Sequence, residues 1–172
     1  DVEYLSHQSI WIDIKIIWAS HEPSDQENRY LSNIFKRNDL SVSIVESLKN
    51  LDKVKSKVTI VNSVGILSQL YWIVKLAYVG GGFSTGVHNL MEPAIAGVPT
   101  LFGPNYKKFK EAIEIVNLDA GHSIKNSSDL KNLISSYLCD EKKLIIAGRA
   151  ARKIVNSHAG ASKKIIDQIY FN

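Results

Sequence analysis

Cysteine is nearly absent from the chain, and long apolar runs are absent altogether. Cys139 is the single cysteine among 172 residues, so no internal disulfide can form, and this fits a reducing compartment. No apolar stretch approaches the roughly 20 residues that a helix needs to cross a bilayer. Asp1 and Glu3 open the chain without a basic flank, so we expect no signal peptide. These shortages favour a soluble globular protein.

The charge is only mildly one-sided. Lys and Arg number 21 against 17 Asp and Glu, a net charge of +4, which favours anionic partners such as nucleotides or an acidic membrane surface. The excess is too small and too scattered to predict nucleic-acid binding. No Cys/His spacing or carboxylate cluster indicates a metal site, so we expect neither metal nor cofactor. At this length and 45% hydrophobic content, one domain over residues 1–172 is expected.

Apolar, β-branched runs alternate with amphipathic segments along the chain. Strands are expected at residues 12–19, 42–45, 58–61 and 76–79, in the run before Gly103, and at 121–124. Helices are expected at residues 24–36, 67–74, just after Asn89, and at 107–117, 126–138, 141–158 and 162–170. The first of them begins at an S-x-x-E capping box, Ser24 to Glu27. The alternation predicts an α/β fold, a Rossmann-like, mostly parallel sheet with helices on both faces. Residues 1–11 show no period and form an irregular or truncated start.

The stretch from Leu76 to Asn105 carries the strongest functional signal. An apolar run ends in Gly80–Gly82, a polar loop follows, and a helix-like segment leads to a second apolar run. This order predicts one βαβ unit whose loop lies at the carboxyl edge of the sheet, where α/β proteins bind ligands. Glycines allow a close backbone approach, and the following helix start suits a phosphate. The other loops expected at this edge are Ser20–Pro23, Asn62–Ile66 and Gly103–Asn105.

The glycine spacing does not fit the common phosphate motifs. A P-loop needs Lys and then Ser or Thr after its second glycine, whereas Gly86 is followed by Val87 and His88. In the dinucleotide fingerprint G-x-G-x-x-G, two residues separate the second and third glycines, whereas three residues separate Gly82 from Gly86. The spacing from Gly80 to Gly86 is therefore one residue too wide. No nucleophile with an adjacent base is recognisable, which argues against a serine or cysteine hydrolase.

Two interpretations remain open for the polar residues of this stretch. Asn89 and Glu92 have capping-box spacing, so they satisfy the start of the helix. Alternatively, Glu92 accepts hydrogen bonds from the two hydroxyls of a ribose, for which an ionised carboxylate is suited. Ser84 and Thr85 likewise contact a phosphate or simply make an exposed loop polar. His21 and His88 lie in loops at the same edge.

Together these motifs resemble the C-terminal domain of 3-deoxy-D-manno-octulosonic acid (Kdo) transferase, and the length of the glycine loop resembles a Bacteroidetes-like branch. The similar segments are AYVGGGF at 77–83, GVHNLMEPA at 86–94, GVP at 97–99 and FGPNY at 102–106. Upstream, ASHE at 19–22 and NSVGIL at 62–67 fall where the other two donor-site motifs of that family belong. The resemblance covers about residues 12–170.

The resemblance implies an inverting, metal-independent GT-B glycosyltransferase of bacterial lipopolysaccharide biosynthesis. Such an enzyme moves Kdo from CMP-Kdo onto a lipid A precursor and associates peripherally with the cytoplasmic side of the inner membrane. Glu92 would bind the ribose of CMP, and the glycine loop with the helix start would bind its phosphate. The residues implied to hold the donor are Ser20, His21, Val64, Gly65, Ile66, Gly81, Gly82, Phe83, Ser84, His88, Asn89, Leu90, Met91 and Glu92.

The chain departs from the family pattern in two respects. The family commonly has proline where this chain has Ser20. We expect the N-terminal domain, which in that family binds the acceptor and supplies the catalytic base, to be missing, and the first strand of the C-terminal domain to be missing or replaced by residues 1–11; we therefore expect no catalytic residue here. The chain alone, a soluble fragment, is expected to bind CMP weakly without transferring sugar. The alternatives are the donor domain of another GT-B enzyme that uses a UDP-sugar, and a truncated module that binds no nucleotide.

Overall fold

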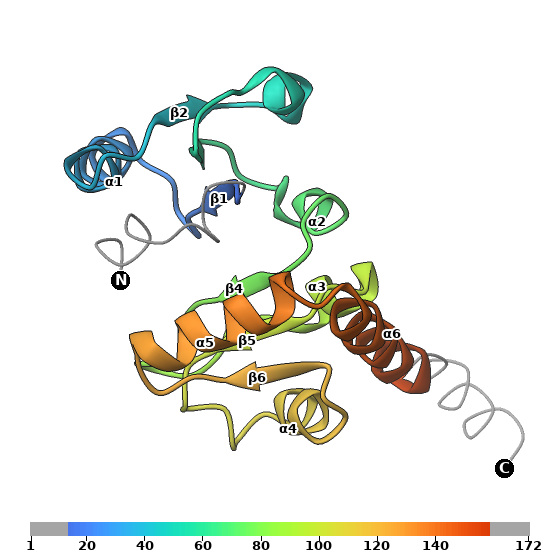
Figure 1. Ribbon diagram of the computed structural model, residues 1–172. Coiled ribbons are helices and arrows are strands. Elements are labelled where there is room, and N and C mark those ends of the chain that lie inside the picture. The colour runs from blue at the N-terminus through green and yellow to red at the C-terminus, as the bar shows by residue number, and fades with distance from the viewer. Residues whose placement is uncertain (1–13, 159–172) are drawn as a thin grey trace, which may run out of the picture. The chain divides into compact units, whose positions relative to one another are not determined.

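A computed structural model describes residues 14–158 of the chain (Figure 1). The expected irregular start at 1–11, the first residues of the strand expected at 12–19, and the helix expected at 162–170 lie outside this range. The chain divides into two compact units, with the boundary between Leu70 and Tyr71, and each is described by itself. The expectation of a single domain stays a prediction.

The first unit is a parallel sheet with one long helix. Its sheet has three strands in the order β1-β3-β2, with Ile16 of β1 and Val42 of β2 both paired to Val58 of β3. Because β3 lies between the other two strands, all four of its residues are buried. The elements are β1 (Ile16–Ala19), α1 (Asp25–Arg37), β2 (Val42–Val45), η3 (Leu48–Lys53), β3 (Val58–Val61) and α2 (Leu67–Leu70).

Local sequence explains why α1 begins where it does and which face it buries. Ser24 is the N-cap, and its Oγ accepts a hydrogen bond from the backbone N–H of Glu27 at 3.2 Å, which confirms the cap expected from the sequence. Leu31 and Phe35, four residues apart on one helix face, pack against Val58 and Ile60 of the sheet. The unit is held together by this apolar contact.

The second unit contains the remaining elements. They are β4 (Ala77–Val79), α3 (Met91–Ala96), β5 (Thr100–Phe102), α4 (Lys110–Asn117), β6 (Gly121–Ser123), α5 (Ser127–Leu138) and α6 (Glu141–His158). The three strands are parallel in the order β4-β5-β6. Leu101 and Phe102 are neighbours on the central strand and therefore point to opposite faces.

Helices cover both faces of this second sheet (Figure 1). Phe102 packs in a core with residues of α3, α4 and α6, among them Ala94 and Ile154. Leu101 packs on the other face with Tyr137 of α5 and Ala147 of α6. Parallel strands flanked by helices confirm the predicted α/β fold class. None of the helices described in residues 14–158 is both long and apolar enough to cross a membrane.

One expected helix is wrong over half its length. The apolar spacing at 67–74 predicted a helix, whereas α2 ends at Leu70 and Tyr71–Ile73 form a turn. The residues after Leu70 are aromatic or β-branched, and such side chains lose rotamer freedom in a helix, which lowers their helix propensity. The helix expected at 107–117 begins only at Lys110. The helix at 141–158 is found at the expected bounds.

Candidate functional site

The glycine turn after β4 is built by backbone packed against backbone. Gly81 has φ +87°, and a Cβ there would lie 2.3 Å from the carbonyl oxygen of Gly86. A Cβ on Gly82 would lie 2.5 Å from the backbone nitrogen of Gly103. The turn itself therefore requires both glycines, whatever they bind. Gly80 differs, because a Cβ there would meet nothing within 4 Å.

Hydrogen bonds close this turn into a fixed loop. The backbone N–H of Asn105 donates to Gly82 O at 2.9 Å, and Asn105 Nδ2 donates to Ser84 O at 3.1 Å. Ser84 Oγ donates to Gly81 O at 3.2 Å. The Ser84 hydroxyl proton is thus used within the loop, although its oxygen can still accept. Phe83, between these anchors, is 51% exposed.

Asn89 and Glu92 are joined at the start of α3. Asn89 Oδ1 accepts from the backbone N–H of Met91 at 2.9 Å, and Asn89 Nδ2 donates to Glu92 Oε1 at 2.9 Å. The pair therefore differs from a capping box, in which the Glu side chain accepts from the backbone N–H of the cap. Glu92 is half-buried, with one carboxylate oxygen oriented by Asn89. The side chain of Leu90 is buried in the core, so only its backbone can face a ligand.

Tyr71 lies close enough to Glu92 to feel its charge, a relation that sequence analysis missed. Its side chain is 8% exposed. Burial raises the pKa of Tyr71 to about 12, and the negative charge of Glu92 contributes to the rise. Tyr71 therefore keeps its proton at alkaline pH values at which an exposed tyrosine loses it. The sequence shows Tyr71 only as one of the apolar residues at helical spacing, and that spacing does not indicate that a charged residue lies nearby.

Helix α6 fixes the other end of α3. Arg152 Nη2 donates to Ala96 O at 2.9 Å, which places a cation at the negative end of the short helix. Gly97 follows with φ +74° and ends α3 in the left-handed conformation. A Cβ on Gly148 of α6 would lie 2.3 Å from Gly97 O, so the two segments touch through their backbones. Glu92 thus stands on a helix held at both ends.

The predicted residues of the first unit lie at one edge of its sheet. Ser20 and His21 follow β1, and the loop with Val64, Gly65 and Ile66 follows β3. The register pairs Ala19 with Val61, so both loops leave the carboxyl edge of adjacent parallel strands. Trp18 Nε1 donates to Ser20 Oγ at 3.3 Å. Val64 is 72% exposed, and Gly65 has φ +80°.

The structure thus gathers the predicted residues into two groups, one at the carboxyl edge of each sheet. Ser20 to Ile66 belong to the first unit, and Gly81 to Glu92 belong to the second. Their role in binding stays a prediction. Among residues 14–158, no group of three or more His, Cys, Asp or Glu side chains is placed to hold a metal ion.

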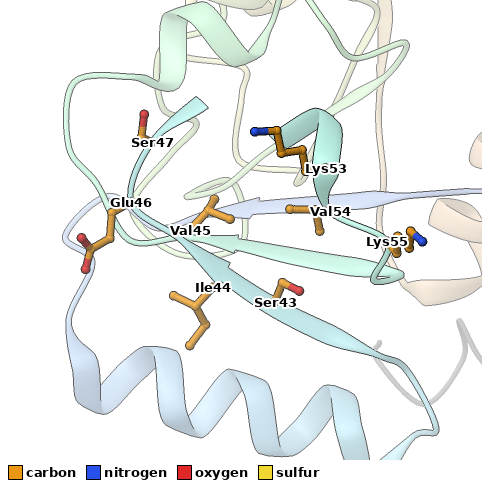
Figure 2. Close-up of a pocket in the computed structure, with 8 residues that line it drawn as sticks. All are labelled: Ser43, Ile44, Val45, Glu46, Ser47, Lys53, Val54 and Lys55. Carbon is orange, nitrogen blue, oxygen red and sulfur yellow. The ribbon is translucent and has the colours of Figure 1, made fainter. Parts of the chain in front are cut away.

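An open hollow of about 770 Å³ also lies in the first unit, between β2 and the segment that follows η3 (Figure 2). None of the predicted donor-site residues lines it. Its lining residues are Ser43, Ile44, Val45, Glu46, Ser47, Lys53, Val54 and Lys55.

Comparison with known proteins gives related sequences. A 3-deoxy-D-manno-octulosonic acid transferase of Aquifex aeolicus is 34% identical over 95 residues, covering 54% of this chain and 27% of that protein. The transferase of Rickettsia prowazekii is 28% identical over 161 residues, covering 92% of this chain and 34% of that protein. The chain is a relative of the Kdo transferases. It spans about a third or less of the length of these relatives, and no family model matches it.

A solved structure supports the fold of this Kdo transferase relative. The crystal structure of the C-terminal CMP-Kdo binding domain of WaaA from Acinetobacter baumannii matches with a TM-score of 0.62. The match covers 89% of this chain and 95% of that domain at 17% identity, so it shows a shared fold. The resemblance to the C-terminal domain of Kdo transferase is therefore confirmed. The Bacteroidetes-like branch stays a prediction.

Proposed function

We propose that this chain is the donor-binding part of a Kdo transferase and holds the CMP portion of CMP-Kdo. The observation that carries the proposal is the arrangement after β4. There, a rigid glycine turn leads directly to a carboxylate, Glu92, that Asn89 already orients. The named relatives and the solved CMP-Kdo binding domain support the choice of nucleotide.

The phosphate of CMP would meet backbone N–H groups of the glycine turn and of the start of α3. Helix α3 has only six residues, so its dipole is small and direct hydrogen bonds matter more. The N–H of Met91 already binds Asn89 Oδ1, which leaves the N–H groups of its neighbours for the phosphate. Such donors stabilise the charge that develops on CMP as it leaves Kdo.

Glu92 would accept hydrogen bonds from the two ribose hydroxyls. Oε1 accepts one bond from Asn89 Nδ2, and a carboxylate has about four lone-pair sites, so capacity for a diol remains. The uncharged hydroxyl of Tyr71, close by, adds no competing negative charge. The residues of the first unit, Ser20, His21 and Val64–Ile66, would contact the rest of the nucleotide.

The whole enzyme requires more than this chain. Because the chain spans only part of the named relatives, we propose that an N-terminal domain supplies the acceptor site and the catalytic base for inverting transfer. We further propose that the acceptor is a lipid A precursor and that the enzyme works peripherally at the cytoplasmic side of the inner membrane. This chain alone should bind donor nucleotide without transferring sugar.

Titration of the 172-residue chain with CMP, UMP and UDP in a calorimeter tests the proposal. We expect CMP to bind most tightly, and CMP at about ten times its dissociation constant should stabilise the fold by roughly 1.4 kcal/mol. Preference for UDP would contradict the proposal in favour of a transferase that uses a UDP-sugar. No binding of any of the three at millimolar concentration would favour a module that binds no nucleotide.

A further inference from the structure

Helix α1 carries a buried asparagine on its apolar face. Asn28 is 2% exposed and shares the buried side of the helix with Leu31 and Phe35. A buried amide needs a hydrogen-bond partner to offset its loss of water. Asn28 Nδ2 donates to Oδ1 of Asn62, 34 positions away in the chain, at 2.7 Å. Asn28 thus connects the first turn of α1 to the residue that follows β3.

Asn62 is the point at which the predicted donor loop leaves the sheet. It directly follows β3, and its backbone N–H donates to Val45 O of β2 at 2.8 Å. Asn62 is therefore held twice, through its backbone by β2 and through its side chain by α1. Beyond it the loop is open, with Val64 72% exposed and Gly65 at φ +80°. The direction of the loop is set at Asn62.

Stability alone does not favour an asparagine at position 28. Its neighbours Leu31 and Phe35 are apolar, and a leucine of similar size would bury more apolar surface among them. Asn28 Oδ1 is buried and has no hydrogen-bond partner among the described residues, which costs free energy. A buried polar pair that is unfavourable for stability can still specify one arrangement.

We propose that Asn28 is a positioning residue for the predicted donor loop: its amide holds Asn62 and thereby fixes the direction in which the Asn62–Ile66 loop leaves β3. The proposal rests on the proposed function, in which that loop contacts CMP. Asn28 itself is 2% exposed, so it is not placed to contact a ligand. Its side chain acts only through Asn62.

The variant Asn28→Leu in the 172-residue chain removes the donor and keeps the size. We expect CMP affinity to fall roughly tenfold, a change of about 1.4 kcal/mol, and amide hydrogen exchange at residues 62–66 to accelerate. The thermal midpoint should hold or rise, because leucine suits the apolar face. Leu31→Ala is the control: it loses core contacts on the same helix, so its midpoint falls, but CMP affinity should hold where the protein is folded.

Asn62→Ala offers a second test that leaves α1 intact. It should weaken CMP binding as Asn28→Leu does, and the double variant should lose no more than either alone, since both remove one contact. Full additivity, or Asn28→Leu with unchanged affinity and unchanged exchange in the loop, would overturn the positioning role. If the parent chain binds no nucleotide, the proposed function fails, while the exchange rates still decide whether Asn28 fixes the loop.

Discussion

Glu92 is the side chain on which the proposed recognition of the nucleotide depends most. Asn89 Nδ2 holds one of its oxygens at 2.9 Å, and the neighbouring Tyr71 is an uncharged phenol whose pKa burial raises to about 12. The orientation of the carboxylate is thus set before a ribose arrives. Groups that are already oriented lose less conformational entropy on binding, which increases affinity.

Replacing Glu92 with glutamine keeps the side-chain length and removes the charge. A neutral amide oxygen is a weaker acceptor than a carboxylate oxygen, so we expect CMP affinity in a calorimeter to fall about tenfold, or about 1.4 kcal/mol. Glu111→Gln is the matched control, because Glu111 also stands in the first turn of its helix, α4. An unchanged affinity in Glu92→Gln, or an equal loss in both variants, would contradict the ribose contact.

Two buried tyrosines make the protein sensitive to alkali. Burial raises the pKa of Tyr71 and of Tyr137 from 10.0 to about 12, with Glu92 and Asp119 as the second causes. The unfolded chain loses these protons near pH 10, whereas the folded chain keeps them. The contribution of these two tyrosines to the free energy of unfolding, measured by denaturant titration, should therefore be fully present below pH 10. It should be lost as the pH rises from 10 to about 12. Tyr71→Phe and Tyr137→Phe should each reduce this fall; an unchanged profile in both would contradict the assignment.

The strand–turn–helix element from β4 to α3 owes its rigidity to backbone contacts. Gly82 lies against Gly103, and Gly97 lies against Gly148 of α6. Asn89 satisfies the start of α3, and Arg152 satisfies its end. A helix of six residues is too short to be stable by itself. Its order therefore depends on these neighbours.

Adding a methyl group at two glycines of the same turn, Gly82 and Gly80, should change stability by very different amounts. Gly82→Ala would place its Cβ 2.5 Å from the Gly103 nitrogen, so the backbone must shift, and we expect a loss of about 3 kcal/mol. Gly80→Ala meets nothing within 4 Å and should change stability by less than about 0.5 kcal/mol. Chemical denaturation measures both. Equal destabilisation would mean that the turn is not packed in this way.

One substitution can remove the hydrogen bond that α6 donates to the end of α3. Arg152→Met keeps the apolar stem and deletes the donor to Ala96 O, so we expect a loss of about 1 kcal/mol in stability and weaker CMP binding. Arg149→Met on the exposed side of the same helix is the control and should have little effect on either. If both variants behave alike, the contact does not order α3.

Taken as a whole, the molecule could be predicted from its sequence where neighbours in the chain decide the structure. The cap Ser24 is found as expected from local residue types, and the parallel strands are found as expected from the alternation of strands and helices. Contacts between distant residues left no such signal. Asn28 and Asn62 are 34 positions apart, and Arg152 and Ala96 are 56 apart. The sequence pattern placed Asn28, Ala96 and Arg152 in helices and Asn62 in a loop, but it did not indicate which residue each of them contacts.

The proposed donor site, as a set of residues, followed from the resemblance to family motifs more than from physical arguments. Glycines at 81 and 82 are required by the turn itself, so their presence alone does not indicate a ligand. The hydrogen bonds of Asn89 bear on both interpretations that the sequence left open: its Oδ1 accepts from the start of the helix, and its Nδ2 orients the Glu92 carboxylate. Binding of a ribose by Glu92 stays a prediction.

The most direct test of nucleotide binding is a CMP titration of the isotope-labelled 172-residue chain, followed by backbone amide chemical shifts in NMR spectra. We expect the largest changes at residues 80–92 and 62–66, saturating with one dissociation constant, and expect them to weaken in Glu92→Gln. Changes centred instead on the hollow beside β2, or no changes at millimolar CMP, would contradict a donor site at the glycine turn.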